Sequence, residues 1–434
     1  MHLTRPTLKA LTTKSLPKAL PTQNGLKYPW LHTLKSTTLQ HLAHQTGIKS
    51  SGTKPVLIRR LEGELARCVY TLPLGHYHGS GSGSGGGSEL RGRGSGEGKE
   101  LRVLSIDMGI RNLAFACLRV TIPPHYSPAS ASGGLAGTKD HEPGKGNGKG
   151  SGIESITLQA WRRLSIPHLR EEFNLTPQRT SKSKIQFITP DEDPPSESTS
   201  AAKEDFSPPI YAHHAYTLIT TLLDRYQPTH ILIERQRFRS GGGSAVQEWT
   251  IRVGMFEGML YAVLEAIGRF SSTSTSSSRD FGGEGQGGVE VWGMEPGRVS
   301  RFWAERGVQD QDQDQGQSDG DGDEGGKGKK GKKKKSVRDV KKMKIGLVGE
   351  WLRQTGEESG ARILVEDEEV KQWVDAFLEK YQGKRRRKDA VEFDIGKLDD
   401  LADCLVQGIT WLEWQRMRQQ VVLSEGRSID RYSL

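Results

Sequence analysis

Acidic side chains stand beside apolar segments at several points along the chain. Asp107 ends the run LRVLSID, and Glu234 ends the run ILIE. Asp399, Asp400 and Asp403 stand together at the start of the segment DDLADCLVQGITWLEW. Residues three or four positions apart share one face of a helix, so Asp403 can pair with either Asp400 or Asp399. Either pairing brings two carboxylates together.

Clustered carboxylates point to metal-dependent chemistry. They repel one another, and proteins tolerate such clusters mainly when cations lie between them. Mg²⁺ prefers hard oxygen ligands in octahedral geometry and is held by a few carboxylates together with substrate phosphate. Two such ions about 4 Å apart activate a water for in-line attack on phosphorus and stabilise the leaving 3′ oxygen. The acids therefore predict Mg²⁺-dependent phosphodiester hydrolysis, in which Mn²⁺ can substitute for Mg²⁺.

Each acid alone also has a simpler interpretation. Asp107 can be a turn residue before Gly109, and Glu234 can form a salt bridge within the segment ERQR. The aspartates at 399–403 can complement the positive end of a helix dipole. The acids occur in unusual settings at all of these places, and this joint pattern favours the metal site.

Basic and amide side chains follow the acids closely in the sequence. Gly109 lets the backbone turn sharply, so that a phosphate or a metal can approach Asp107. Asn112 can hold this turn through its side-chain amide. Guanidinium groups can grip backbone phosphates in a bidentate manner. Four arginines are candidates for this role, with a solvated loop as the alternative: Arg111, Arg235, Arg237 and Arg239.

The apolar patterns predict the elements that position these residues. Strands are expected at 101–107, 112–120, 156–166, 229–235 and 289–296, and helices at 207–226, 245–268, 337–352 and 399–419. Three strands, then helix, strand, helix, strand and closing helices form an α/β order. We therefore expect a mixed five-stranded sheet flanked by helices.

The helix expected at 245–268 carries more than one apolar stripe. Its main row runs at steps of four and three through Trp249, Val253, Phe256, Leu260, Val263 and Ile267. Met255 and Met259 flank that row. One face can pack on the sheet while the other meets a second subunit, and deep burial within a monomer is the alternative.

A basic block precedes the predicted sheet. Residues 34–65 are expected to form two short helices, the first ending at Gly47 and the second beginning at Pro55. The block resembles a SAP-type DNA-binding module, and a hairpin that docks a protein partner is the alternative. Four basic residues around the joint are the candidates for DNA contact: Lys49, Lys54, Arg59 and Arg60.

Composition limits the class of protein. The formal net charge of +9 and the pI near 9.3 favour a polyanionic partner such as nucleic acid. Three cysteines without a CxxC pair support neither a disulfide framework nor a zinc ribbon. No apolar run approaches the roughly 18–20 residues of a membrane-spanning helix, so no membrane partner is expected. Nothing in the sequence calls for a small-molecule cofactor.

Three segments together resemble one known family. SIDMGIRNLA, ILIERQRFRS and DDLADCL occur in an order and context similar to those of the fungal mitochondrial Holliday-junction resolvases, which belong to the RNase H-like nuclease superfamily. The resemblance covers about 101–419 without the low-complexity insertions. It implies an RNase H-like fold and a homodimer that makes paired nicks across a four-way DNA junction. It also implies Mg²⁺ ligands at Asp107, Glu234, Asp403 and one of Asp399 or Asp400.

The resemblance and the composition together divide the chain. Residues 1–30 have the basic, acid-poor composition of a mitochondrial transit peptide, which predicts location in the mitochondrial matrix; a basic tail that contacts nucleic acid is the alternative. The remaining parts are a SAP-like module (31–70), a Gly/Ser linker (71–100), the resolvase domain (101–420) with insertions at 124–152, 178–205, 271–288 and 308–335, and a C-terminal tail (421–434).

Other functions remain as alternatives at this level. A sugar-kinase or actin-like ATPase also begins with a strand that ends in DxG, but this chain lacks a second acidic-glycine phosphate loop after a later apolar strand. A DNA-binding protein without catalytic activity would not need all of the acids. A nuclease for RNA:DNA hybrids would need neither the SAP-like module nor the long apolar helix.

Overall fold

The computed structural model describes residues 27–70, 99–122, 156–175, 206–236, 248–274, 288–314, 336–353, 363–383 and 395–427. Most of the predicted transit peptide, nearly all of the Gly/Ser linker, the insertions at 124–152 and 178–205, most of those at 271–288 and 308–335, and the end of the tail lie outside these ranges.

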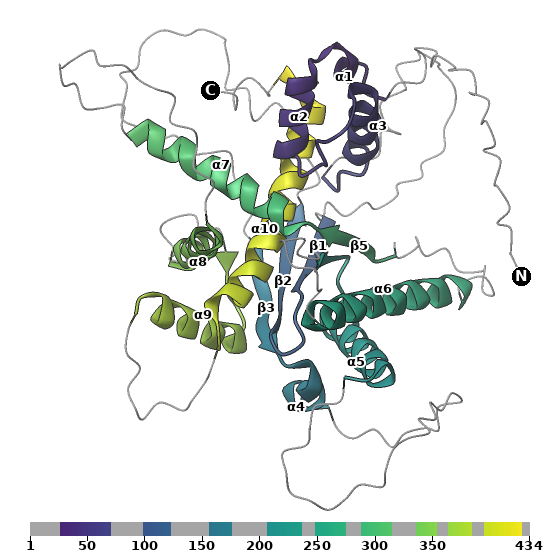
Figure 1. Cartoon of the computed structure of the whole chain (residues 1–434), viewed down its shortest axis with the longest axis vertical. Coiled ribbons are helices and arrows are strands. Elements are labelled where there is room, and N and C mark those ends of the chain that lie inside the picture. Colours follow the sequence, from purple (N-terminus) through teal and green to yellow (C-terminus); the bar gives the residue numbers. More distant parts are fainter. Residues whose placement is uncertain are drawn as a thin grey trace, which may run out of the picture.

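A mixed sheet of six strands forms the centre of the molecule, in the order β5-β4-β1-β2-β3-β6 (Figure 1). The strands are β1 Lys99–Asp107, β2 Leu113–Ile122, β3 Ile156–Leu164, β4 His230–Glu234, β5 Glu290–Met294 and β6 Ile363–Leu364. β1, β2 and β3 pair antiparallel, whereas β4 runs parallel to β1 and β5 parallel to β4. The prediction of a mixed sheet flanked by helices is confirmed. The predicted number of five strands is wrong. The sixth strand, β6, has only two residues, too few to show the apolar–polar alternation from which a strand is predicted.

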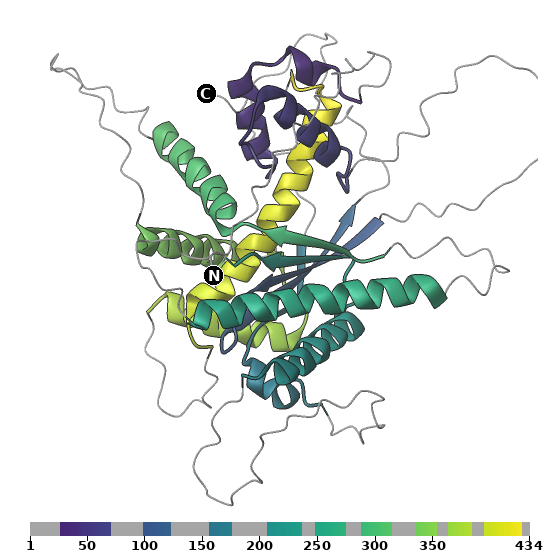
Figure 2. The same ribbon diagram turned by 45° about the vertical axis from the view of Figure 1, so that its right-hand side comes forward.

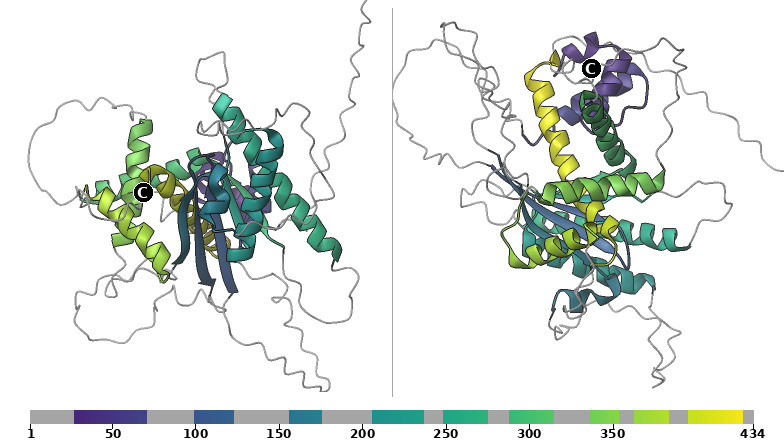
Figure 3. Two further views of the ribbon diagram at one scale, coloured as in Figure 1. Left: turned by 90° about the horizontal axis from the view of Figure 1, so that it is seen from below. Right: turned by 90° about the vertical axis from the view of Figure 1, so that its left-hand side faces the viewer.

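Helices cover both faces of the sheet (Figure 3). One face packs against a short helix and two longer ones: α4 Leu169–Glu172, α5 Pro208–Tyr226 and α6 Glu248–Ser274. The other face packs against α7 Pro296–Asp314, α8 Val337–Arg353, α9 Glu368–Tyr381 and α10 Leu398–Leu423. Side chains of β1 alternate between the two faces of the sheet. Val103 packs in the core beneath α7–α10, whereas Leu104 and Ile106 pack in the core beneath α4–α6.

The four long helices predicted from the sequence are present as α5, α6, α8 and α10. The prediction missed α7 and α9. α7 was missed because its second half is the polar repeat QDQDQD, which carries no apolar periodicity and leaves only a short periodic stretch at its beginning. α9 has a signal that could have been read, because Asp367 accepts hydrogen bonds from the backbone N–H groups of Glu369 and Val370 as an N-cap. Within the described ranges, no helix is both long and apolar enough to cross a membrane.

A small helical module packs on the C-terminal end of α10 (Figure 2). It contains α1 Trp30–Thr33, α2 Ser36–Gln45 and α3 Lys54–Leu65, so the two predicted helices are present and α1 is additional. Val421 of α10 belongs to the core of the module. α10 therefore extends beyond its predicted end at 419 because its last turns have an apolar surface to cover. The resemblance to a SAP module stays a prediction.

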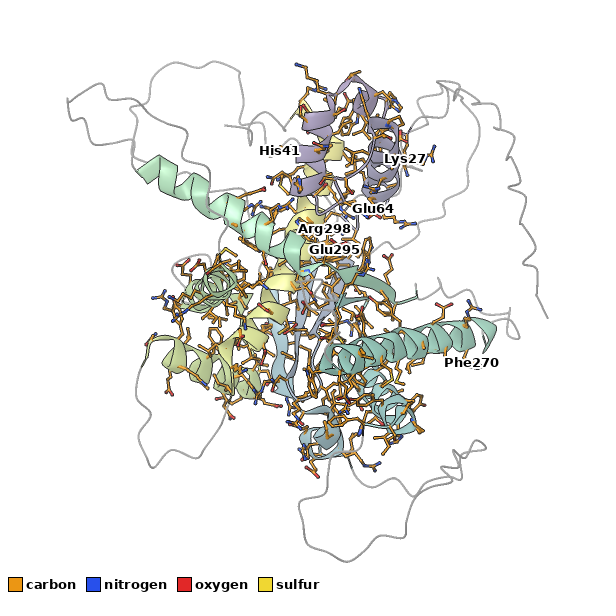
Figure 4. All side chains as sticks on the ribbon, in the orientation of Figure 1. Lys27, His41, Glu64, Phe270, Glu295 and Arg298 are labelled. Carbon is orange, nitrogen blue, oxygen red and sulfur yellow. The ribbon has the colours of Figure 1, made fainter. Side chains whose placement is uncertain are left out.

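Buried polar contacts anchor the module. The Arg418 side chain is 3% exposed, and its Nε donates a hydrogen bond of 3.0 Å to Thr46 O. The same guanidinium forms an ion pair of 3.4 Å with Glu64. Arg298 of α7 donates to Gly47 O at 3.0 Å, and Figure 4 shows Glu64 and Arg298 where the module meets α7. The module is thus held against both α7 and α10.

Gly47 is expected to be essential to this packing. Its φ of +68° is unfavourable for other residues, and an added Cβ would lie 2.1 Å from the Trp414 ring. Gly47→Ala should therefore lower the free energy of unfolding by roughly 2–4 kcal/mol, measured by urea denaturation. Gly63→Ala is the matched control, because no atom lies within 4 Å of its added Cβ, and it should leave stability equal or slightly higher. Equal losses in both variants would contradict this account.

Candidate active site

Parallel pairing of β1 and β4 places two of the predicted acids side by side. The register aligns Ile106 with Ile233, so the next residues in each strand, Asp107 and Glu234, end at the same edge of the sheet. Because side chains alternate along a strand, both acids point to the face that α10 covers, as Ser105 does. Asp107 is 8% exposed, and its carboxyl lies within hydrogen-bonding range of the Glu234 carboxyl.

Close packing of α10 on β1 brings the C-terminal aspartates to the same edge. An added Cβ on Gly408 would lie 3.3 Å from Ser105 Cβ of β1 and 2.8 Å from Leu118 Cδ1 of the neighbouring strand β2, so glycine favours this approach. The Ser105 hydroxyl donates to Cys404 O at 2.7 Å, and the Gln407 amide donates to Ser105 Oγ and Ile106 O at 3.1 Å. These buried hydrogen bonds fix the position of α10 along β1, and therefore where its first turn, which carries the aspartates, lies relative to the end of β1.

The carboxylates of α10 lie close enough to Asp107 to shift its pKa. Burial raises the pKa of Asp107 well above its usual range, and the hydrogen bond to Glu234 and the negative charges of Glu234, Asp403 and Asp400 raise it further. Burial also raises the pKa of Asp403, although Lys344 partly opposes this shift. Asp107, Glu234, Asp400 and Asp403, which come from three separate segments of the chain, thus lie close enough to interact electrostatically, and this group is called the pocket of acids.

Lysines of α8 separate the two candidates for the last acidic position. Lys341 Nζ forms an ion pair with Asp399, and Lys344 Nζ lies 2.9 Å from Asp403 Oδ1. Burial favours the neutral form of Asp399, but the hydrogen bond and charge of Lys341 outweigh it, and the pKa of Asp399 lies below its usual value. Asp400, in contrast, is among the groups that raise the pKa of Asp107. Asp400 therefore acts electrostatically on Asp107, while Asp399 pairs with Lys341 of α8.

The donor set fits a divalent cation bound by hard oxygens. Asp400 Oδ2 is buried and accepts no hydrogen bond from the described residues, so a cation would give it a partner. Burial, together with the charge of Asp399, raises the pKa of Asp400 to about 6, which a bound cation would reverse. In the described part of the chain, no group of three or more His, Cys, Asp or Glu side chains already has the spacing of a metal site. Coordination of one ion by several of these carboxylates would therefore require their side chains to turn.

The predicted rim residues lie on the two loops that follow β1 and β4. Arg111 and Arg235 are exposed at these loops, and Asn112 is half-buried. The Asn112 backbone holds the turn, since an added Cβ on Gly109 would lie 2.8 Å from Asn112 O. Gly109 is thus required by a close backbone approach. The other two predicted arginines, Arg237 and Arg239, lie outside the described residues.

Sequence reasoning missed two residues that hold the loops in place. Glu257 of α6 accepts a hydrogen bond of 3.0 Å from the Gln236 backbone N–H, two residues after Glu234. Gln407 links α10 to β1, as described above. A polar residue within a long apolar helix is the signal that could have identified both, because such residues are retained where they have a buried partner.

The four basic candidates of the helical module fall into two pairs. Lys54 Nζ donates to His32 O at 3.0 Å, and Arg60 donates to Lys49 O and to Ser51 O, so these two side chains stabilise the module itself. The Lys49 and Arg59 side chains are exposed and have no ion pair with the described residues. The structure therefore leaves Lys49 and Arg59 as the pair best placed for an external anion.

Sequence comparisons find related proteins over most of the chain. The family described as "Mitochondrial resolvase Ydc2 / RNA splicing MRS1" matches residues 103–421, which include all of the acids of the pocket. A relative from Schizosaccharomyces pombe, named "Cruciform cutting endonuclease 1, mitochondrial", is 25% identical over 383 residues, covering 88% of this chain and 93% of the relative.

Solved structures show more distant likenesses. The yeast mitochondrial Holliday junction resolvase Ydc2 is 21% identical with a TM-score of 0.44, covering 90% of this chain and 98% of that one. RuvC of Thermus thermophilus is 13% identical with a TM-score of 0.28, covering 73% of this chain and 96% of that one.

Asp400 and Asp399 should respond oppositely to neutralisation. The raised pKa of Asp400 means that its charged form destabilises the metal-free fold above a pH of about 6. Asp400→Asn should therefore stabilise the metal-free protein at pH 8 by roughly 1–2 kcal/mol, allowing for partial exposure to water. This gain should shrink as the pH falls through about 6, measured by thermal unfolding in EDTA.

Asp399→Asn is the matched control. It removes the ion pair with Lys341, so it should lower stability at pH 8. Added Mg²⁺ should raise the melting temperature of the wild type and of Asp399→Asn, but much less that of Asp400→Asn, because only the last variant loses a ligand. Loss of the Mg²⁺ response in Asp399→Asn alone would reverse the assignment.

Proposed function

Because the chain belongs to the family of the mitochondrial resolvase Ydc2 and the RNA-splicing protein MRS1, we propose that it is a Mg²⁺-dependent endonuclease that resolves four-way DNA junctions by paired symmetric nicks. The S. pombe relative is named as a cruciform cutting endonuclease, which supports this substrate. The family description also includes RNA splicing, so membership alone leaves a second kind of activity. The convergence of four carboxylates at one edge of the sheet favours the nuclease.

Asp107, Glu234, Asp400 and Asp403 are the proposed metal ligands. A divalent cation at these oxygens would supply Lewis-acid activation of water and stabilise charge on the scissile phosphate. Glu234 and Asp107 hold the sheet side of the pocket, and Asp400 and Asp403 hold the α10 side. Lys344 provides a fixed positive charge beside Asp403, which limits the repulsion among these groups before a cation binds.

Protein nucleophiles are poor candidates at this pocket. Cys404 is fully buried, and burial raises the pKa of its thiol well above the usual value, with further contributions from Asp107 and Asp403. A thiol in this state is neutral and unreactive. Direct attack by water, oriented by the carboxylates, therefore agrees best with the residues present.

Cationic side chains around the pocket are the proposed DNA contacts. Arg111 and Arg235 lie on the loops that carry Asp107 and Glu234, so they are placed to bind phosphates next to the cleaved one. Asn112 holds the first of these loops. Arg237 and Arg239 continue the second loop and are proposed for the same role from the sequence alone.

The assembly and the location are part of the same proposal. Symmetric nicking needs two active sites, which a homodimer supplies. The middle of the main stripe of α6, at Val253, Phe256 and Leu260, is buried within the chain, so a second subunit would use another face of this helix. Mitochondrial location, in the matrix, is supported by the name of the S. pombe relative and by the basic composition of residues 1–30.

Asp107→Asn should separate binding from cleavage. The amide can keep a hydrogen bond to Glu234 and preserves the basic surface, but it cannot replace a carboxylate ligand. Junction affinity should stay within about twofold, while the cleavage rate with Mg²⁺ should fall on the order of 10³-fold, as expected for the loss of several kcal/mol of stabilisation. A labelled four-way junction and a linear duplex of equal length are the substrates. Equal cutting of the linear duplex, or preference for an RNA:DNA hybrid, would contradict the resolvase assignment.

Lys49 and Arg59 should contribute to affinity through phosphate contact. Exchanging both for alanine should weaken junction binding without changing the thermal stability, because neither side chain has an ion pair within the described protein. The slope of log affinity against log salt should fall by about 2, one for each lost contact. Lys54→Ala with Arg60→Ala should instead destabilise the module, because these side chains donate to backbone carbonyls. An unchanged salt slope for the first pair would remove the module from the DNA surface.

A further inference from the structure

An exposed indole stands at the beginning of α6, against the loop that follows Asp107. The main stripe of this helix is buried, with Val253 at 5% exposure and Phe256 and Leu260 at 0%. Trp249 begins the same stripe, one turn earlier, but 43% of it is exposed. Phe270, at the far end of the helix, is also exposed (Figure 4), but it lies away from the pocket. Large exposed apolar side chains beside a functional site indicate a contact surface.

Neighbouring side chains fix the orientation of this indole. The Arg111 guanidinium carbon lies 5.8 Å from the centroid of the Trp249 ring. The Phe206 ring approaches edge-on, with centroids 6.1 Å apart and an interplanar angle of 82°. Arg252 lies 4.2 Å over the Phe206 ring and forms an ion pair with Glu248. A ring held in this way loses little conformational freedom when a ligand stacks on it.

The indole is also tied to the acids through the loops. Arg111, which lies against it, follows Asp107 by four residues in the same turn. About two helical turns further along α6 from Thr250 and Ile251, the Glu257 carboxylate accepts a hydrogen bond from the Gln236 backbone N–H on the loop after Glu234. A groove of about 320 Å³ opens there, lined by Gln236, Thr250, Ile251, Gly254, Met255 and Glu257. The start of α6 therefore borders both loops that carry metal ligands.

We propose that Trp249 is a stacking platform for a nucleobase that leaves the duplex stack at the branch point of the junction, next to the cleaved phosphate. This inference rests on the proposed function. Continuous stacking is interrupted where strands exchange between arms, so a base there can be displaced at less cost than within a duplex. Stacking on an aromatic ring needs no particular base, and arginine adds cation–π attraction. The positive charge of Arg111 favours the phosphates on either side of that base.

A fluorescent base analogue tests this proposal directly. Four-way junctions carry 2-aminopurine at each nucleotide beside the branch point, and binding is measured with Ca²⁺ in place of Mg²⁺ to prevent cleavage. Anisotropy of a second label gives the affinity. Wild-type protein should change the 2-aminopurine emission at one or two positions. Trp249→Ala should abolish that change and weaken binding roughly five- to tenfold.

Two variants serve as controls. Trp249→Phe keeps an aromatic face and should retain most of the emission change and the affinity. Ile251→Ala removes an apolar side chain of similar exposure, two residues away, and should behave as the wild type. Unchanged emission and affinity in Trp249→Ala, or an equal loss in Ile251→Ala, would overturn the stacking role.

Two further outcomes are distinguishable from these. If Trp249→Ala turned a dimer into a monomer without DNA, measured by sedimentation, the indole would belong to a subunit interface and the proposal would be overturned. A wild-type protein that binds the linear duplex as tightly as the junction would contradict the proposed function itself. If the wild type bound and cleaved junctions normally and Trp249→Ala had no effect, only the stacking role of Trp249 would be contradicted.

Discussion

The close contact between α10 and β1 determines where the acidic side chains lie. Gly408 favours the approach, since an added Cβ would lie 3.3 Å from Ser105 Cβ of β1 and 2.8 Å from Leu118 Cδ1 of β2, and the bonds from Ser105 and Gln407 fix the register of the helix against β1. A shift of one residue along α10 would turn Asp403 by about 100° away from Asp107. The pocket thus depends on apolar packing and on two buried polar side chains that do no chemistry themselves.

Electrostatic repulsion is the cost of this arrangement. Burial and neighbouring carboxylates raise the pKa of Asp107, Asp400 and Asp403, which means that the fold would be more stable if these groups were uncharged. Lys341 and Lys344 of α8 partly compensate by pairing with Asp399 and Asp403. A cation bound between such carboxylates would relieve their mutual repulsion, and this relief would add to the free energy of binding.

The same helix also connects the pocket to the basic module. α10 runs from the acids at its first turns to Arg418 and Val421, which are buried against the module (Figure 2). Arg418 is 3% exposed and binds both Thr46 O and Glu64, so the module cannot swing freely on this side. A rigid helix between the two sites keeps the basic surface of Lys49 and Arg59 at a constant distance from the acids, which suits a DNA substrate of fixed geometry.

Local patterns in the sequence were sufficient for most of the elements. Asp107 and Glu234 were recognisable as candidates because each ends an apolar run, and the aspartates of α10 because Asp403 shares a helix face with either Asp399 or Asp400. α7 and β6 were not recognisable, since a polar continuation and a two-residue strand carry weak periodicity, whereas the N-cap Asp367 and the amphipathic pattern of α9 were present in the sequence and were missed.

The choice between Asp399 and Asp400 was beyond the sequence. It depends on which carboxylate faces Lys341 of α8, and that ion pair joins residues 58 positions apart. The roles of Lys54 and Arg60 were equally hidden, because each binds a backbone carbonyl brought close by the turn of the module. Sequence by itself determined which chemical groups are present and on which elements they lie. Only the tertiary structure decided which of them meet, because those contacts arise from packing between segments far apart in the chain.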